Sequence, residues 1–531
     1  MNIAEILERR AHAQPNQAAI IDNHRGRSRT TGFGELNEAA ARLATRLHRH
    51  GLKQGDTVLV LQPMSAELYT VLSALFRLGL VAMFLDPSTG REHMERCCRR
   101  HPPRALIASP KAHLLRLLSP ALRRIPLAFS TGAWVPGAKR IASAEKLPQA
   151  PAVELPDSAP ALLTFTSGST GEPKAAVRSH GFLMAQHRTL EAGLALQSGE
   201  VDLSTLPIFV LANLASGVTS LIPNVDLRSP GRINARRLLL DIQRHQPSRS
   251  GASPAFFQRL VEHCRATATT LPALKKIYTG GAPVFPDLLE RLQQVAPAAR
   301  VTAVYGSTEA EPIAHVAHEE ISPAEITAMV GGRGLLAGTP VPEIELRILP
   351  ERWGTPLEPF TREAFEAQCL PAGEPGEIVV SGEHVLPGYL QGLGDAETKF
   401  EVDGRRWHRT GDSGYLDERG RLWLLGRSSA RIQDAKGILY PFAVECAARQ
   451  LPAVTACALL ELNGERLLAV EMKSTLDLAE LRYRLTWARL DRVVLLDRIP
   501  MDRRHNAKVD YPMLRQRLIN VASQGRQAKP A

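Results

Sequence analysis

The sequence predicts an α/β protein: a large N-terminal domain of doubly wound sheets with a β-rich subdomain, followed by a small, mobile α+β C-terminal domain. The chain has 531 residues, and single hydrophobic cores stop growing beyond roughly 250–300 residues. Short apolar runs alternate with amphipathic helical stretches near the N-terminus, which is the pattern of βαβ units. After Arg427 the pattern changes, and apolar runs flank an Asn463-Gly464 turn that is typical of a β-hairpin. We therefore expect two domains, at residues 1–427 and 428–531.

Hydrophobic periodicity predicts the elements of the large domain. The run TVLVL at residues 57–61 is short, apolar and bounded by polar turns, as buried strands of a parallel sheet are. The expected strands are residues 57–61, 81–85, 106–108 and 301–304, and the expected helices are residues 3–13, 33–52 and 66–78. Because strands and helices alternate, we expect the doubly wound pattern to continue through these segments.

Two further regions complete the expected fold. Glycine-rich runs from about residue 338 to residue 426, with strand patterns at residues 377–380 and 422–425, predict the β-rich subdomain. The C-terminal domain is expected to contain helices at residues 441–450 and 476–487 and strands at residues 456–460, 467–470 and 492–496. Residues 523–531 are small and polar, and we expect them to be frayed.

Composition excludes several classes of protein. Hydrophobic residues make up 44% and charged residues 22% of the chain, close to the average for globular proteins. No run approaches the ~18 apolar residues that a membrane span needs, and the first residues lack the apolar segment of a secretory signal. Six cysteines without a CxxC pair predict neither a disulfide framework nor a zinc site. A cytoplasmic protein without a transmembrane segment is expected.

The net charge is +11, with a pI near 9.5. The densest basic run covers residues 91–124. No zinc-finger spacing or RNA-recognition signature accompanies it, and aromatic residues make up only 5% of the chain, so nucleic acid is not an expected partner. A solvated face, an acidic carrier protein, the phosphates of CoA and a membrane-associated complex all stay open as explanations of this run.

The segment most informative about function is TFTSGSTGEPK, at residues 164–174. Its glycines allow the backbone to turn and to direct successive N–H groups at an anion. Interleaved hydroxyls and the terminal Lys174 extend that cradle. The spacing differs from the G-x-x-x-x-G-K-[ST] pattern of a Walker A loop. A phosphate-binding loop of another kind is therefore predicted.

This string resembles the pattern [ST]-[ST]-G-[ST]-T-G-x-P-K of the adenylate-forming superfamily, which contains acyl-CoA synthetases, luciferases and peptide-synthetase adenylation domains. Further segments resemble the family's motifs in the family's order: TGGAP at residues 279–283, YGSTE at 305–309, WHRTGD at 407–412, GR at 426–427 and RHNAKVD at 504–510. The resemblance covers nearly the whole chain.

The resemblance implies a role for each matching residue. Adenine would lie beside Tyr305 and the glycine-rich strand end, and the Asp412 carboxylate would accept hydrogen bonds from the ribose hydroxyls. The nucleotide-binding residues implied are Thr166, Ser167, Gly168, Ser169, Thr170, Gly171, Gly281, Ala282, Tyr305, Gly306, Asp412 and Arg427. The catalytic residues implied are Lys174, Thr308, Glu309 and Lys508, with Glu309 also the ligand of Mg²⁺.

The reaction implied by the resemblance has two steps. A carboxylic acid, fatty or 3-hydroxy fatty, attacks the α-phosphorus of ATP in the presence of Mg²⁺, giving acyl-AMP and pyrophosphate. The small domain then rotates, and the acyl group passes to CoA or to the phosphopantetheine of a carrier protein, with Gly437 guiding the thiol. Positioning and electrostatics, rather than covalent catalysis by the protein, would lower the barrier.

Three departures from the commonest family pattern bear on the second step. Val210 stands where many acyl-CoA synthetases have histidine, Ser428-Ser429 replaces a hinge Asp or Lys, and R-H-N-A-K replaces T-x-x-G-K before the lysine. Three strings together look most similar to the olefin-pathway branch: L-P-I-F-V-L-A-N-L-A-S-G at residues 206–217, L-I-P-N-V-D at residues 221–226 and R-H-N-A-K at residues 504–508. In that branch the hydroxyl of a β-hydroxy acid closes a β-lactone. Such an enzyme needs no thiol tunnel.

Three functions therefore stay open from the sequence: transfer to a thiol, β-lactone formation, and adenylate binding without catalysis. In each of the two catalytic functions the acid is expected near the segment that contains Val210, Leu211, Leu214 and Gly217. The length of the acyl chain and the oligomeric state are not predicted.

Overall fold

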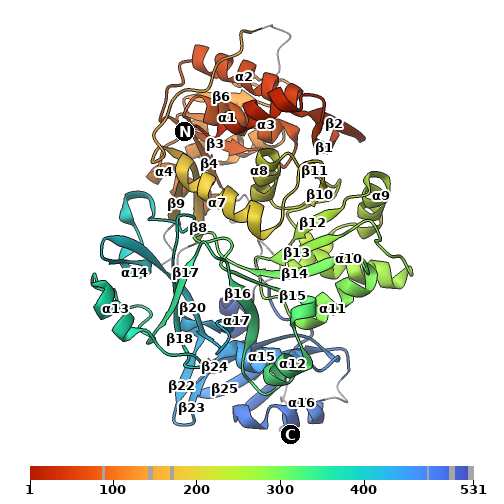
Figure 1. Cartoon of the computed structure of the whole chain (residues 1–531), viewed down its shortest axis with the longest axis vertical. Helices are drawn as coiled ribbons and strands as arrows, with labels where there is room; N and C mark the ends of the chain where they lie inside the picture. The colour runs from red at the N-terminus through yellow and green to blue at the C-terminus, as the bar shows by residue number, and fades with distance from the viewer. Residues whose placement is uncertain are drawn as a thin grey trace.

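The computed structural model describes residues 1–24, 26–85, 90–141, 147–167, 173–474, 478–501 and 509–523, and gives the backbone alone for residues 166, 167 and 521–523. The N-terminal elements lie at one end of the molecule and the C-terminal elements at the other (Figure 1). The expected α/β class, with a C-terminal α+β domain, is confirmed.

A seven-stranded sheet among the described residues forms the N-terminal end, in the order β7-β6-β5-β3-β4-β8-β9. All neighbours pair in parallel except β8 and β9. Its strands are β3 (Thr57–Leu61), β4 (Val81–Phe84), β5 (Ala105–Ala108), β6 (Leu127–Ser130), β7 (Lys139–Arg140), β8 (Pro160–Ser167) and β9 (Pro173–Ser179). The helices around it are α1 (Ala4–Ala13), α2 (Phe33–Arg49), α3 (Ala66–Arg77), α4 (Arg91–Arg100), η2 (Ala112–Leu114), α5 (Leu115–Leu118) and α6 (Pro120–Arg123).

A second sheet, of fourteen strands among the described residues, crosses the middle of the molecule (Figure 1). Its parallel part contains β1 (Ala18–His24), β10 (Val201–Ser204), β11 (Thr219–Leu221), β12 (Arg249–Ala252), β13 (Lys276–Gly280) and β14 (Arg300–Tyr305), with β2 (Arg27–Gly32) antiparallel at its edge. The helices of this part are α7 (His180–Gly193), α8 (Pro207–Ser216), η3 (Pro230–Arg232), α9 (Ala235–His245), α10 (Pro254–Ala266) and α11 (Pro286–Val295).

The β-rich region continues this sheet rather than forming one of its own. β15 (Ala314–Ala317) pairs with both β14 and β16 (Leu335–Pro340), and so joins the two halves. The antiparallel half adds β17 (Glu345–Leu349), β18 (Gly376–Ser381), β19 (Lys399–Val402), β20 (Arg405–Leu416) and β21 (Leu422–Arg427). Its helices are η4 (His318–Glu320), α12 (Pro323–Val330), α13 (Arg362–Gln368), η5 (Leu390–Gly392) and α14 (Asp395–Thr398).

The expected strands at residues 106–108 and 301–304 both form, as parts of β5 and β14, but they belong to different sheets. Their local patterns are alike because each is a short, buried, parallel strand. Partner choice is made by long-range pairing, which hydrophobic periodicity does not encode.

The C-terminal elements form a three-stranded sheet, β24-β25-β26, among the described residues. They are η6 (Ser428–Ala430), β22 (Ile432–Asp434), β23 (Gly437–Leu439), α15 (Pro441–Arg449), β24 (Val454–Leu462), β25 (Glu465–Met472), α16 (Leu478–Arg484), η8 (Thr486–Ala488), β26 (Arg492–Leu495) and α17 (Tyr511–Ser523). The expected hairpin is present, with positive φ at Asn463 and Gly464, as a type I′ turn requires.

The helix expected at residues 476–487 is shorter in the structure. α16 ends at Arg484, a separate turn of 3₁₀-helix follows, and Arg489 then has a φ of 49°. Residues 476–477 of the expected helix and residues 524–531 of the expected frayed end lie outside the described residues. No helix in the described part of the chain is long and apolar enough to cross a membrane.

Candidate active site

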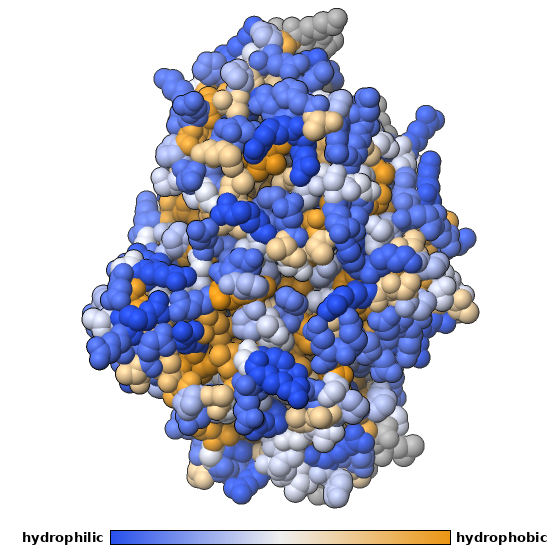
Figure 2. Space-filling view, in the orientation of Figure 1, coloured by the Kyte–Doolittle hydropathy of each residue, from blue (hydrophilic) through white to orange (hydrophobic). Residues whose placement is uncertain are grey.

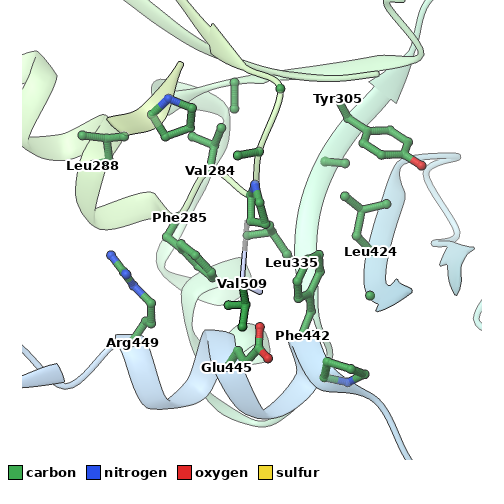
Figure 3. A pocket seen from close by; sticks show the side chains of 18 of the residues that line it. Val284, Phe285, Leu288, Tyr305, Leu335, Leu424, Phe442, Glu445, Arg449 and Val509 are labelled. Carbon is green, nitrogen blue, oxygen red and sulfur yellow. The ribbon is translucent and has the colours of Figure 1, made fainter. Parts of the chain in front are cut away.

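A cavity of about 460 Å³ lies where the large domain meets the C-terminal elements. Apolar side chains gather in this half of the molecule in the space-filling view (Figure 2). The cavity is lined from the large domain by the ends of β13 and β14 and by β16, and from the C-terminal side by α15 and the start of α17. Figure 3 shows Phe442, Glu445 and Arg449 of α15 facing Phe285 and Leu335 of the large domain.

The glycine-rich end of β13 forms one wall of this cavity. A Cβ at Gly280 would lie 2.5 Å from the carbonyl oxygen of Val304 on the neighbouring strand, so no side chain fits there. Gly281 follows with a φ of +81°, which glycine adopts without strain. Gly281, Ala282, Tyr305 and Gly306, four of the expected nucleotide-binding residues, line the same cavity. This wall leaves room for a flat group beside the Tyr305 ring.

Tyr305, Asp412 and Arg427 form one polar cluster at the cavity. The Tyr305 hydroxyl donates a hydrogen bond to Asp412 Oδ2 at 2.8 Å, and Arg427 Nε lies 3.4 Å from Asp412 Oδ1. The Asp412 carboxylate raises the pKa of Arg427, while burial followed by the same carboxylate raises the pKa of Tyr305. The Asp412 carboxylate is therefore held by a hydrogen bond from Tyr305 and by an ion pair with Arg427.

The strand pairing places Asp412 in this cluster. Asp412 and Arg427 are direct partners in the antiparallel pair β20–β21. On β20, Arg409 forms a fully buried ion pair with Glu377 of β18, with nitrogen–oxygen distances of 2.7 and 2.8 Å. Bidentate pairs of this kind restrict geometry strongly. The pair fixes β20, which carries Asp412 to the cavity, against β18.

Glu309 lies beside three titratable side chains. The Tyr389 hydroxyl donates to Glu309 Oε1 at 2.7 Å, and Lys399 and His408 are close enough to affect its charge. Burial alone would raise the pKa of the Glu309 carboxyl, but His408, the Tyr389 hydrogen bond and the Lys399 charge together lower it. Burial lowers the pKa of Lys399 to about 7 and that of His408 to about 3. Glu309 is thus an anion in a largely dehydrated place.

Lys174 reaches the same cluster from β9. Its Nζ forms an ion pair with Glu397 Oε2 at 2.7 Å and lies 6.0 Å from the centre of the Tyr389 ring. Isolated bridges pair Ala176 with Tyr389 and Ala310 with Val385. The segment that carries Tyr389 therefore connects β9 to the loop of Glu309, and it brings Lys174 and Glu309, which are far apart in the sequence, to one place.

Thr308 is held by Arg178 of β9. Arg178 Nη2 donates to the carbonyl oxygen of Thr308 at 2.8 Å, and Nη1 donates to Thr164 Oγ1 of β8 at 2.7 Å. Arg178 is buried. It thus connects the strand that leads into the predicted phosphate loop with the loop that carries Thr308 and Glu309.

Several predicted residues lie outside the described part of the chain. They are Gly168, Ser169, Thr170, Gly171 and Lys508. For Thr166 and Ser167 only the backbone is described, at the end of β8, where Thr166 pairs with Lys174. Met501 and Val509, which flank residues 502–508 in the sequence, pair with each other and both line the 460 Å³ cavity.

Sequence reasoning did not identify Tyr389, Glu397, Lys399 or Arg178 as site residues. None of them belongs to the motifs quoted above, and Tyr389 reaches the site through its pairing with Ala176 of β9. His408 lies within the WHRTGD string, but its neighbourhood with Glu309 could not be inferred from that string.

The residues expected near the acid do not belong to the described lining of the 460 Å³ cavity. Val210 is fully buried in α8, in a core cluster with residues of α3. Leu211 and Leu214 line a separate apolar cavity of about 70 Å³ between α1, α7 and α8. Gly217, with a φ of 74°, ends α8.

The family model for AMP-binding enzymes matches residues 7–390 of this chain. The chain belongs to the family of AMP-binding enzymes. Two relatives are named olefin beta-lactone synthetase, from Stenotrophomonas maltophilia (strain K279a) and from Xanthomonas campestris pv. campestris. Each is 31% identical to this chain, over 96% of both sequences.

A solved structure of O-succinylbenzoate coenzyme A synthetase from Bacillus subtilis, in complex with ATP and magnesium ion, shares the fold of this AMP-binding enzyme. The TM-score is 0.74 at 24% identity, covering 97% of this chain and 99% of the other. Membership of the family confirms the expectation of an AMP-forming, acyl-adenylating ligase.

Proposed function

We propose that this AMP-binding enzyme adenylates a 3-hydroxy fatty acid and then lets the acid's own hydroxyl close a β-lactone. The observation that carries the proposal is the similarity, over 96% of both chains, to two olefin beta-lactone synthetases. We include in the proposal the division of the chain into an adenylation domain, residues 1–427, and a C-terminal domain, residues 428–531.

In the proposed complex, adenine lies between the Gly281–Ala282 wall and Tyr305, and the ribose hydroxyls donate to the Asp412 carboxylate. This placement is supported by the lining of the cavity and by the position of Asp412 between Tyr305 and Arg427. Asp412 already accepts a hydrogen bond from the Tyr305 hydroxyl. On ribose binding, a ribose hydroxyl would replace that donor on a carboxylate whose orientation is already set.

The phosphates would extend from the ribose toward the Lys174 and Glu309 cluster, with Thr308 and the hydroxyls of the predicted loop as donors. Among the described residues no group of three or more His, Cys, Asp or Glu side chains could hold a metal ion by itself. The half-buried Glu309 carboxylate nevertheless fits Mg²⁺, which commonly takes one or two protein carboxylates and completes its shell with phosphate oxygens and water. When bound, Mg²⁺ supplies positive charge to the phosphate oxygens.

We propose that the Lys508 ammonium stabilises the charge that develops at the α-phosphate of ATP. Lys508 directly precedes Val509 in the sequence, and Val509 lines the cavity. A carboxylate oxygen of the acid attacks the α-phosphorus and the bond to pyrophosphate breaks. Negative charge accumulates on the α-phosphate oxygens, where a lysine ammonium stabilises it.

In the second step the 3-hydroxyl oxygen attacks the acyl carbonyl carbon of the acyl-AMP. The hydroxyl proton is lost, the carbon–oxygen bond to AMP breaks, and AMP leaves with the oxygen that came from the carboxylate. No external thiol takes part. The buried valine at position 210, in place of the histidine common in acyl-CoA synthetases, supports a reaction without a thiol route.

A second candidate function is transfer of the acyl group to CoA or to the phosphopantetheine of a carrier protein. It is favoured by a relative named feruloyl-CoA synthase, from Amycolatopsis sp, which is 28% identical over 86% of this chain. The thiol would then approach past Gly437, which has a φ of 105°.

The test is to incubate the enzyme with ATP, Mg²⁺ and a panel of plain and 3-hydroxy acids, with and without CoA, and to identify products by mass spectrometry. A product lighter than the 3-hydroxy acid by one water, formed without CoA, supports the lactone. Thioester formation only in the presence of CoA contradicts it. Normal pyrophosphate release by Lys508→Ala would show that the role assigned to Lys508 is wrong.

A further inference from the structure

The net charge of the chain is concentrated in one segment. From Arg96 to Ile141 the sequence contains ten Lys or Arg residues and no Asp or Glu. Outside this segment 55 basic residues face 54 acidic ones, since the chain has 65 and 54 in total. Less than a tenth of the chain therefore carries all but one unit of the net charge of +11, and none of these ten residues is among the site residues discussed above.

The same segment exposes large apolar side chains. Leu114, Leu117, Leu118 and Trp134 are exposed by 59%, 72%, 62% and 69%, respectively. In the described part of the chain seven large apolar side chains are more than half exposed, and these are four of the seven. Three of them lie within five residues, in η2 and α5. Exposed apolar groups gathered in this way mark interaction sites.

Contacts between elements place these side chains on one surface. Arg116 Nη1 approaches the carbonyl oxygen of Pro136 at 3.5 Å, which brings α5 next to the loop of Trp134. Arg123 Nη2 donates to the carbonyl oxygen of Leu117 at 3.3 Å, so α6 closes the other side. We call the four apolar side chains, together with Arg116, Arg123 and Arg124, the basic–apolar patch.

The patch lies at the edge of the seven-stranded sheet that also leads to the phosphate side of the active site. β5, β6 and β8 all run in the same direction in this sheet. η2 and α5 follow the carboxyl end of β5, the Trp134 loop follows that of β6, and residues 168–172 follow that of β8. The patch and the entrance to the predicted phosphate loop therefore share one edge.

The combination of chemistries favours a lipid surface. Leucine and tryptophan side chains enter the boundary between headgroups and acyl chains, while arginine and lysine bind lipid phosphates and keep their charged ends in the headgroup layer. A nucleic acid would engage the cations and leave the leucines exposed to water. We propose that the basic–apolar patch docks this enzyme on the surface of a bilayer that contains anionic phospholipids, without crossing it.

Docking of this kind has a consequence for substrate supply. Amphiphilic acids partition into bilayers, so an enzyme held at the surface meets them at a high local concentration. Docking depends on the charge and the exposure of the basic–apolar patch. It is therefore expected whichever acceptor the second step uses.

The test is co-sedimentation of the full-length protein with vesicles of phosphatidylcholine alone or mixed with phosphatidylglycerol. We expect binding to the mixed vesicles only, weakened by salt because the cations are exposed. The quadruple variant Leu117→Ser, Leu118→Ser, Arg123→Glu, Arg124→Glu should lower the partition coefficient by roughly tenfold or more. Its adenylation of a short, water-soluble acid should be unchanged, which shows that it is folded.

A matched control lies on α9. Leu240 is 61% exposed, and Arg236 and Arg237 are exposed beside it in the sequence. The variant Leu240→Ser, Arg236→Glu, Arg237→Glu changes the net charge by the same amount and should keep vesicle binding within about twofold. The proposal is overturned if the protein does not bind the mixed vesicles. It is overturned equally if the patch binds an acidic protein and not the vesicles. Equal loss in the patch and control variants overturns it as well.

Discussion

The Tyr389 hydroxyl lies 2.7 Å from Glu309 Oε1 and donates a hydrogen bond to it. The Lys174 and Lys399 ammonium groups lie 6.0 and 5.8 Å from the centre of the same tyrosine ring. Tyr389 is therefore in contact range of the proposed magnesium ligand and of the proposed phosphate-binding lysine. Its hydroxyl orients the Glu309 carboxylate, and its ring packs beside the Lys174 ammonium.

Removal of this hydroxyl should weaken the use of MgATP. Tyr389→Phe keeps the ring but removes one donor from the half-buried Glu309 carboxylate, and partners of metal ligands are commonly worth 10- to 100-fold in metal affinity. We expect the Mg²⁺ concentration for half-maximal pyrophosphate exchange to rise by roughly tenfold. Tyr483→Phe, at a side chain that is 78% exposed, is the control. An unchanged Mg²⁺ dependence in Tyr389→Phe would argue against Glu309 as the ligand.

Loss of the charge at position 412 should weaken ATP binding. Asp412 accepts from Tyr305 and pairs with Arg427, and hydrogen bonds to a charged group are worth about 1.5–3 kcal/mol each. Asp412→Asn should raise the KM for ATP by roughly 10- to 100-fold and leave the KM for the acid less affected. Glu290→Gln on the exposed side of α11 should change neither. Equal KM values for ATP in Asp412→Asn and the native enzyme would exclude the ribose role.

Substitutions at two glycines distinguish the effect of displacing the Lys174 side chain from the effect of backbone strain. Gly394 and Gly404 have φ values of +97° and +75°, so alanine at either one costs about 1 kcal/mol or somewhat more. A Cβ at Gly394 would lie 2.6 Å from Lys174 Nζ, whereas a Cβ at Gly404 meets nothing within 4 Å. Gly394→Ala should therefore lower kcat for acyl-AMP formation by roughly 10- to 100-fold, while Gly404→Ala lowers stability alone. Similar rates in both variants, measured by pyrophosphate release, would contradict the role of Lys174.

Much of the fold could be predicted from local patterns, because a short apolar run such as that of β3 by itself indicates a buried strand. Motif strings likewise identified Tyr305, Asp412 and Glu309, whose surroundings the structure now describes. The surroundings of Glu309 were not predictable. Tyr389 reaches it through the segment that pairs with β9 and with Ala310, and Lys399 donates a hydrogen bond to the Leu386 carbonyl oxygen of that segment. Such pairing depends on contacts between distant parts of the chain, which no local pattern records.

Glu445 should make stability depend on pH. Its carboxyl is buried on α15 at the cavity, accepts hydrogen bonds from the Leu459 amide and the Tyr511 hydroxyl, and burial raises its pKa from 4.5 to about 7. Between those values the folded state keeps a proton that the unfolded state has lost. The stabilisation is therefore fully present below about pH 4.5 and is lost as the pH rises through about 7, a change of about 3 kcal/mol.

Thermal denaturation of the full chain from about pH 5 to about pH 8 checks this sign. Glu445→Gln, which stays neutral, should show a smaller fall in Tm over that range than the native enzyme. Glu480→Gln, at an exposed carboxylate on α16, should follow the native curve. A Glu445→Gln curve parallel to the native one would mean that Glu445 ionises normally in the folded protein.

The central claim is that the acid's own 3-hydroxyl displaces AMP. The most direct measurement uses a 3-hydroxy fatty acid with ¹⁸O in its hydroxyl, together with ATP and Mg²⁺ and without CoA. We expect AMP release and a product one water lighter than the acid that retains the label in its ring, whereas the matched acid without a 3-hydroxyl gives little AMP turnover. Release of AMP that begins only when CoA is added, with the labelled hydroxyl intact in a thioester, would contradict the account.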